Sequence, residues 1–204
     1  MKTPFRYQAT EYDCVPTTFI NALQYLFDRE DIPPVAIQKI MQYSLDTINK
    51  RGEFGKGGGT TEFAVRMILQ WLESYSSGSF ALANCEYLPK EQVHLRQGNK
   101  IIACINRGGI ALIRVCFDNK GADFHYVLTL GVDAQDKDYL LFFDPYFRVR
   151  NFSVDESVDM QWLGSSIAQK PNLRISRKRL DLDSYAKYCM RPLCERECCF
   201  LERQ

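Results

Sequence analysis

The chain has 204 residues, of which 46% are hydrophobic and 25% are charged, as is typical of a globular protein with a substantial core. Its 26 basic and 25 acidic side chains leave a formal net charge of +1, so no overall field favours nucleic acid or an anionic membrane as a partner. The sequence has no run of about 18 apolar residues for a membrane span, and its polar start lacks the apolar stretch of a secretory signal.

The N-terminal part of the chain has the periodicity of helices. Asp13 is a suitable N-cap, and apolar residues recur at helical spacing from Cys14 to about Asp28, which predicts a first helix. The two prolines of "DIPPVAIQKIMQYSLDTI" open a second helix, and a threonine pair caps a third over "EFAVRMILQWLESY". Between the second and third helices, "RGEFGKGGG" (51–59) is a loop by its glycine content.

After the third helix the pattern changes to that of strands. "SFALANCEYL" is compatible with a strand, and "NKIIACINRGG" is a short helix that Asn99 caps and a glycine pair ends. Three strand-like runs follow at 110–117, 124–133 and 138–146, and their connections suit antiparallel hairpins. Helices followed by strands indicate the α+β class, with N-terminal helices packed on a C-terminal antiparallel β-sheet.

The last quarter of the chain has a less regular pattern. The basic run "RISRKRLDLD" (174–183) alternates with apolar residues and predicts a strand with one solvated face, and the tail from about 181 onward predicts helix at first. We expect residues 151–204 to complete or extend one domain that covers residues 1–204.

Four cysteines lie close together in the tail: Cys189, Cys194, Cys198 and Cys199. Zinc sites usually have paired C-x2-C ligands, and this spacing differs, so we interpret these residues as packed or redox-sensitive thiols and predict no metal. The chain has eight cysteines and no apparent export signal, which favours free thiols and a cytoplasmic location.

A histidine and an aspartate stand where a catalytic cysteine would need them. Nucleophilic cysteine requires a base, a group that orients the base, and donors for the oxyanion. Of the two histidines, His125 opens the apolar strand "FHYVLTLGV", and Asp144 ends the next strand in "LLFFDPY". A hairpin of these strands would place both residues at one end. We expect the carboxylate to accept the imidazole Nδ1–H and to leave Nε2 for the thiol.

Cys14 is the candidate nucleophile. It stands at the N-terminal end of the first predicted helix, where unpaired amides and the positive end of the helix dipole favour a thiolate. The Cys14 backbone N–H is one oxyanion donor. The Gln8 carboxamide is the natural second donor if the loop 8–13 folds back.

The order of these residues resembles the papain-like cysteine peptidase superfamily, and most closely its C39 and C39-like group. The matching motifs span roughly residues 5–150: they are Gln8, Asp13-Cys14, His125-Tyr126-Val127 and Asp144-Pro145. The resemblance implies a papain-like fold with Cys14 as nucleophile, His125 as base, Asp144 as orienting group and Gln8 in the oxyanion hole.

The glycine-rich segment before the third helix also resembles that group. "GGGTTEFAVRMILQWL" is similar to its loop beside the cleft, so Gly58, Gly59 and Thr60 are predicted substrate contacts. Val15 stands where the group commonly has glycine, and we expect it to narrow the approach to the thiol. The sequence disfavours a phosphate-binding loop because no serine or threonine follows Lys56 directly, and favours a flexible loop that borders the cleft.

The sequence therefore predicts a thiol hydrolase that cleaves a peptide or isopeptide bond through a thioester. Its predicted partner is a peptide or protein substrate, and the chemistry calls for neither a cofactor nor a metal. Two alternatives stay open. The thioester could pass its acyl group to an amine or thiol, as in an acyl or amide transferase. The protein could instead be a catalytically silent pseudo-peptidase that binds a peptide or protein in the same cleft.

Overall fold

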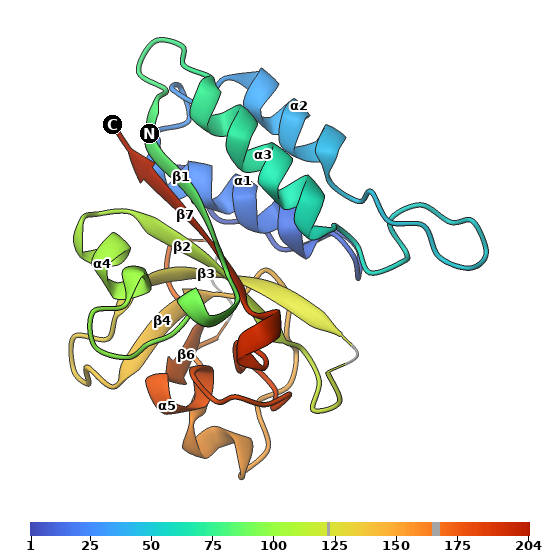
Figure 1. The fold of residues 1–204 in the computed structure, drawn as a ribbon. Helices are drawn as coiled ribbons and strands as arrows, with labels where there is room; N and C mark the ends of the chain where they lie inside the picture. Colours follow the sequence, from blue (N-terminus) through green and yellow to red (C-terminus); the bar gives the residue numbers. More distant parts are fainter. Residues whose placement is uncertain (122, 165–167) are drawn as a thin grey trace.

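The computed structural model describes residues 1–121, 123–164 and 168–204 and shows a mixed α/β protein. Figure 1 shows three helices, α1 (Cys14–Leu26), α2 (Pro34–Tyr43) and α3 (Glu62–Ser74), packed together on one face of the sheet. The shorter helices α4 (Lys100–Asn106) and α5 (Arg177–Leu180) lie apart from them. The predicted order of helices and strands is confirmed over the first 143 residues.

The three N-terminal helices form where the sequence places them. α1 begins at Cys14 and is buried along almost its whole length, which explains its dense apolar spacing, and it ends at Leu26, two residues before the predicted end. α2 has proline at its first turn. The threonine cap of α3 is confirmed, because the side chain of Thr61 accepts a hydrogen bond from the backbone N–H of Ala64.

All strand pairs of the sheet are antiparallel, and within the described residues the strands lie in the order β1-β7-β2-β3-β4-β6-β5. Their bounds are β1 (Leu82–Pro89), β2 (Ile110–Cys116), β3 (Phe124–Val132), β4 (Tyr139–Phe143), β5 (Met160–Trp162), β6 (Leu173–Ser176) and β7 (Glu197–Arg203). The predicted hairpins β2–β3 and β3–β4 are confirmed. β7 lies between β1 and β2, so the last strand of the chain is paired on both sides, next to the edge strand β1 (Figure 1).

Two apolar clusters cover the two faces of the sheet. One packs α1, α2 and α3 against it, and the other packs α4 and the C-terminal segments against the opposite face. The neighbours Cys198 and Cys199 on β7 belong to different clusters, because successive side chains of a strand point to opposite faces. Cys198 and Cys199 therefore belong to two different cores, Cys189 is buried, and Cys194 is exposed.

The prediction for residues 174–183 is only partly correct. β6 ends at Ser176, because the Ser176 side chain accepts a hydrogen bond from the Arg179 N–H and caps α5. The prediction of helix from about 181 onward is wrong for the described residues. A segment without α-helix follows, and the buried Arg196 holds it by an ion pair with Asp181 at 2.6 Å and by hydrogen bonds to backbone carbonyls.

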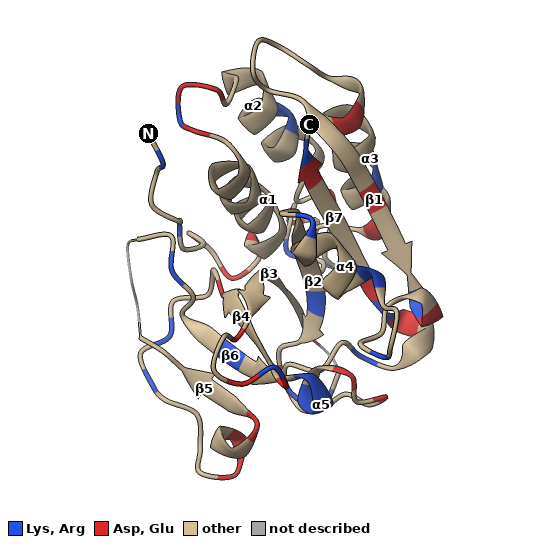
Figure 2. Ribbon diagram, turned by 90° about the vertical axis from the view of Figure 1, so that its left-hand side faces the viewer, with Lys and Arg blue, Asp and Glu red and all other residues tan. Residues whose placement is uncertain are grey.

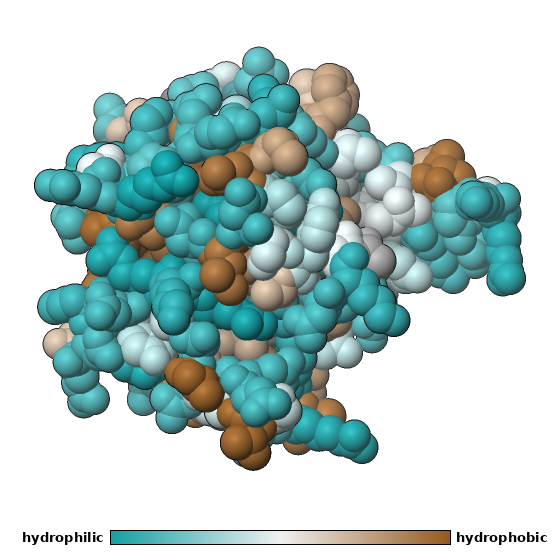
Figure 3. Space-filling model, turned by 60° about the horizontal axis from the view of Figure 1, so that its bottom comes forward, coloured by the Kyte–Doolittle hydropathy of each residue, from teal (hydrophilic) through white to brown (hydrophobic). Residues whose placement is uncertain are grey.

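The molecular surface carries both signs of charge. Figure 2 shows basic and acidic residues interspersed over helices and strands, with a basic run on α5. The face in Figure 3 is mostly hydrophilic, with separate hydrophobic spots, and it has a projection on the side where Figure 1 places the loop between α2 and α3. Among the described residues, no helix is long and apolar enough to cross a membrane.

Candidate active site

Cys14 lies at the first position of α1, with 7% of its surface exposed. The residue before it does not cap the helix, which corrects the sequence-based expectation. The Asp13 carboxylate instead accepts hydrogen bonds from the backbone N–H groups of Ala9 and Thr10, at 2.9 and 2.7 Å, and so closes the loop that precedes the helix. The amides at the start of α1 are therefore left without a side-chain acceptor from Asp13.

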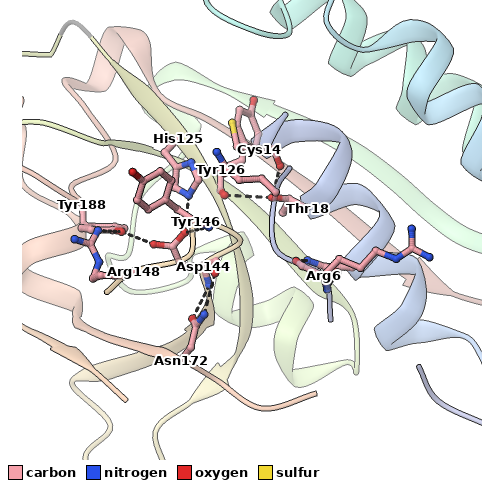
Figure 4. A network of polar contacts seen from close by, with 12 residues as sticks. Arg6, Cys14, Thr18, His125, Tyr126, Asp144, Tyr146, Arg148, Asn172 and Tyr188 are labelled. Carbon is pink, nitrogen blue, oxygen red and sulfur yellow. Dashed lines mark hydrogen bonds and ion pairs between the residues drawn. The ribbon is translucent and has the colours of Figure 1, made fainter. Parts of the chain in front are cut away.

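His125 and Asp144 form a buried pair. His125 opens β3, Asp144 follows β4, and the imidazole Nε2 lies 2.6 Å from Asp144 Oδ1. Figure 4 shows the His125 ring between Asp144 and Cys14. The side chains are 4% and 0% exposed, so little water competes with this contact. The predicted juxtaposition of the two residues at one end of the β3–β4 hairpin is confirmed.

The prediction that Nδ1 of His125 faces the carboxylate is wrong. Nε2, not Nδ1, contacts Asp144, which leaves Nδ1 on the side of Cys14. The strand register explains the difference. Leu128 pairs with Phe143, so Asp144 is not opposite His125 but about two residues along the neighbouring strand. Nε2 is the ring nitrogen farther from the His125 backbone, and it is the one that spans this diagonal distance.

The charges of the pair stabilise each other. Burial by itself lowers the pKa of His125, but the Asp144 carboxylate and the Cys14 thiol outweigh it and raise this pKa from 6.5 to about 10. Burial raises the pKa of Asp144, but the charge of His125 and hydrogen bonds from His125, Tyr188 and the Tyr146 N–H bring it below its usual value. Within the folded protein the histidine is therefore an imidazolium and the aspartate a carboxylate at neutral pH.

Gln8 lies at the same cavity as Cys14 and His125. Its backbone N–H donates to the Pro145 carbonyl at 2.9 Å, so the N-terminal segment is tied to the residue that follows Asp144. Its carboxamide Nε2 donates one hydrogen to the Thr10 carbonyl at 2.7 Å. A carboxamide nitrogen carries two hydrogens, and the second is available to a substrate oxygen. The loop 8–13 folds back through the hydrogen bonds from Ala9 and Thr10 to Asp13, which is the condition on which the predicted role of Gln8 depends.

A cavity of about 360 Å³ opens at Cys14 and His125. Aromatic rings surround the imidazole: Phe117 lies 5.2 Å and Tyr146 6.4 Å from it, measured between ring centroids. The remaining lining residues come from the N-terminal loop, the glycine-rich loop and the start of β3: Gln8, Glu11, Tyr12, Lys56, Gly58, Asp123 and Phe124. Two loops and the start of a strand therefore form the walls of the cavity at the thiol.

Of the four predicted substrate contacts, only Gly58 lines this cavity. The prediction that Val15 contacts the substrate is wrong, because its side chain is fully buried in the core between α1 and the sheet. Val15 therefore does not narrow the approach to the thiol. Gly59 and Thr60 hold the loop instead. The Gly59 carbonyl accepts from the Thr47 side chain at 2.9 Å, and Thr60 Oγ1 accepts from the Leu45 N–H at 3.0 Å.

Several residues around Asp144 could not be identified in the sequence. Asn172 clamps the Asp144 main chain, because its Oδ1 accepts from the Asp144 N–H at 2.7 Å and its Nδ2 donates to the Asp144 carbonyl at 2.9 Å. Tyr188 contacts the carboxylate itself. These contacts depend on where residues after 150 join the sheet, and no local sequence pattern indicates that. The Tyr146 N–H, two residues after Asp144, is the one donor that an Asp-Pro turn indicates.

Comparison of the chain with protein-family profiles and with curated proteins gives no match. The geometry of the site is what defines it: a thiol at a helix start, a buried imidazolium–carboxylate pair and a carboxamide at one cavity.

Proposed function

We propose that this protein is a thiol hydrolase that cleaves a peptide or isopeptide bond with a catalytic triad of Cys14, His125 and Asp144. The observation that carries the proposal is the buried contact of 2.6 Å between His125 Nε2 and Asp144 Oδ1, with Cys14 on the other side of the ring at an open cavity. A buried, ionised pair of this kind is unusual unless it serves stability or chemistry, and here it faces a thiol.

In the proposed reaction His125 holds the proton of Cys14 on Nδ1, and the thiolate attacks the carbonyl carbon of the substrate. The oxyanion that forms accepts hydrogen bonds from the Cys14 N–H and from the Gln8 carboxamide. His125 then gives its proton to the leaving amine, and a thioester remains on Cys14. Water attacks the thioester with His125 as base, which releases the acid and restores the thiol.

The substrate class rests on the resemblance to papain-like peptidases of the C39 and C39-like group. The shape of the cavity supports it. The wall on one side is the main chain of the glycine-rich loop at Gly58, where φ is +115° and no side chain obstructs the approach. Phe124 lies beside Gly58, with its ring 3.9 Å from the place that a Cβ of residue 58 would take, and Phe124 and Tyr146 offer flat aromatic surfaces to the cavity. Extended polypeptides suit such a site, since they have backbone amides for the loop and side chains for the aromatic rings.

The test uses a digest of cellular proteins as substrate, because it contains many peptide sequences at once. New N-termini that appear on incubation are labelled and identified by mass spectrometry, with wild type, Cys14→Ala and Cys194→Ala compared. Cys194 is the exposed thiol outside the site and serves as the matched control. We expect new termini with wild type and Cys194→Ala only. Equal cleavage by Cys14→Ala, or no cleavage by any variant, would contradict the proposal. Acyl transfer to added hydroxylamine in place of hydrolysis would favour the transferase alternative.

A further inference from the structure

Tyr188 belongs to the segment between α5 and β7 and reaches Asp144 from the side opposite His125. Its ring is fully buried, and its hydroxyl donates a hydrogen bond to Asp144 Oδ2. The same hydroxyl accepts a hydrogen bond from Arg148 Nη2 at 2.8 Å. Figure 4 shows the resulting row of side chains from Arg148 through Tyr188 and Asp144 to His125.

The direction of the hydroxyl proton is fixed by chemistry. A guanidinium can only donate, so the Tyr188 oxygen must accept from Arg148 and its single proton must go to Asp144. Burial and the charge of Asp144 raise the pKa of Tyr188 well above its usual value, so the hydroxyl keeps its proton at any pH of interest. The donor to Asp144 Oδ2 is therefore permanent.

The two oxygens of Asp144 have separate partners. Oδ1 lies at His125 Nε2 and also accepts from the Tyr146 N–H at 2.8 Å, and Oδ2 accepts from Tyr188. A carboxylate rotates about the bond to Cβ unless both oxygens are held. The hydrogen bond from Tyr188 to Oδ2, together with that from the Tyr146 N–H to Oδ1, thus fixes the rotation of the carboxylate, and Oδ1 orients the imidazole.

The main chain at Tyr188 adopts an unfavourable conformation to make this contact. Its φ is +59°, in the left-handed region that bulky residues rarely enter. The conformation is held by hydrogen bonds to β2: the Tyr188 N–H donates to the Cys116 carbonyl at 2.8 Å, and the Cys116 N–H donates to the Cys189 carbonyl at 2.9 Å. Such strain persists where the surrounding structure enforces it, often at functional sites.

We infer that Tyr188, held by Arg148, is a positioning residue of the catalytic site: it fixes the Asp144 carboxylate so that His125 presents Nδ1 to Cys14. This inference rests on the proposed function. It assigns a role to the part of the chain that matched no family motif, because the last quarter supplies the group that completes the site.

A double-mutant cycle tests the inference through the rate of Cys14 alkylation by iodoacetamide at pH 7, followed by peptide mapping. The four proteins are wild type, Tyr188→Phe, Asp144→Ala and the double variant. We expect Tyr188→Phe to lower the rate about tenfold in the wild-type background and to change it less than about twofold when Asp144 is already alanine. A residue that only stabilises the fold would lower the rate by the same factor in both backgrounds, and that result would overturn the inference.

Tyr126→Phe is the matched control. Tyr126 is a buried tyrosine next to His125 on β3, and its hydroxyl has no hydrogen-bond partner among the described residues. Its removal should leave the alkylation rate unchanged. If Tyr188→Phe does not fold, Arg148→Met decides the question, since it keeps the Tyr188 hydroxyl but frees its orientation. We expect Arg148→Met to lower the alkylation rate less than Tyr188→Phe does, and to lower it only when Asp144 is present. An equal loss of rate in the wild-type and Asp144→Ala backgrounds overturns the inference.

A different result would contradict the proposed function. If Cys14 of the wild type is alkylated no faster than Cys14 of His125→Ala, the cysteine is not activated and the proposed function is wrong. If it is activated but Tyr188→Phe reacts at the wild-type rate, only the role of Tyr188 is wrong.

Discussion

Replacing Asp144 by asparagine should change the charge of His125 at neutral pH. In the folded protein the carboxylate and the Cys14 thiol overcome burial and raise the pKa of His125 to about 10. Without the carboxylate, burial, which is the largest single effect on this pKa, is opposed by Cys14 alone among the groups named, and we expect the pKa to fall below 6.5, its ordinary value. At pH 7.5 a histidine of pKa about 10 is more than about 99% protonated, and one of pKa 6.5 is only about 9% protonated. The substitution therefore removes nearly all of the imidazolium.

Nitrogen NMR of protein labelled with 15N-histidine measures this directly, because the chain has only two histidines. His94→Gln assigns the two pairs of ring signals. In wild type we expect His125 to keep both ring nitrogens protonated up to a pH of about 10, and above that to retain the proton on Nε2, which faces Asp144. In Asp144→Asn the signals should titrate below pH 6.5.

Asp133→Asn is the matched control for this prediction. It also removes a carboxylate from an ion pair, here with Arg174 at 2.5 Å, but that pair lies outside the catalytic cavity. The His125 titration should stay as in wild type. Titration of wild-type His125 near pH 6.5, or an unchanged titration in Asp144→Asn, would refute the electrostatic reasoning.

Three further predictions concern stability. Asn172→Ala removes both hydrogen bonds to the buried main chain of Asp144 and should lower the free energy of unfolding in urea by about 2 to 4 kcal/mol; a loss under about 1 kcal/mol would contradict the clamp. Gly59→Ala should be at least about 1 kcal/mol more destabilising than Gly52→Ala. Both glycines have φ of +78°, but only at Gly59 would an added Cβ lie 2.7 Å from a carbonyl oxygen, that of Tyr12. Equal losses of stability in the two variants would exclude the clash. The lowered pKa of Asp144 contributes stability that is present above its ordinary value of 3.8 and is lost as pH falls through the lower folded value, so acid unfolding curves of Asp144→Asn should be flatter than those of wild type.

The helices and hairpins that position the site could be predicted because their signals are local. Helical spacing places Cys14 at the start of α1, and two apolar runs joined by a short polar connection place His125 and Asp144 at one end of a hairpin. The ring nitrogen that faces Asp144 could not be predicted. It depends on a register that puts the carboxylate about two residues away from the position opposite His125, and a turn sequence does not specify this offset.

The residues beyond 150 show more clearly which contacts could not be predicted from the sequence. Asn172 and Tyr188 reach Asp144 only because β6 pairs with β4 and because the segment after α5 crosses beside β2. Neither contact has a sequence period or spacing, since each joins residues that lie far apart in the chain. Val15 shows the opposite error, a contact that was predicted but does not exist. A position next to Cys14 in sequence was expected at the cleft, but one step along a helix turns a side chain by about 100°, and Val15 points into the core.

The pH dependence of Cys14 alkylation, compared between wild type and His125→Ala, tests the central claim most directly. Brief pulses of iodoacetamide across the pH range, followed by peptide mapping, give the rate at Cys14 alone. An activated Cys14–His125 pair predicts half-maximal labelling of wild type well below the value of about 8.5 that a free thiol shows, and a move toward that value in His125→Ala. A wild-type Cys14 that labels like a free thiol, with the same profile in both proteins, would contradict the account.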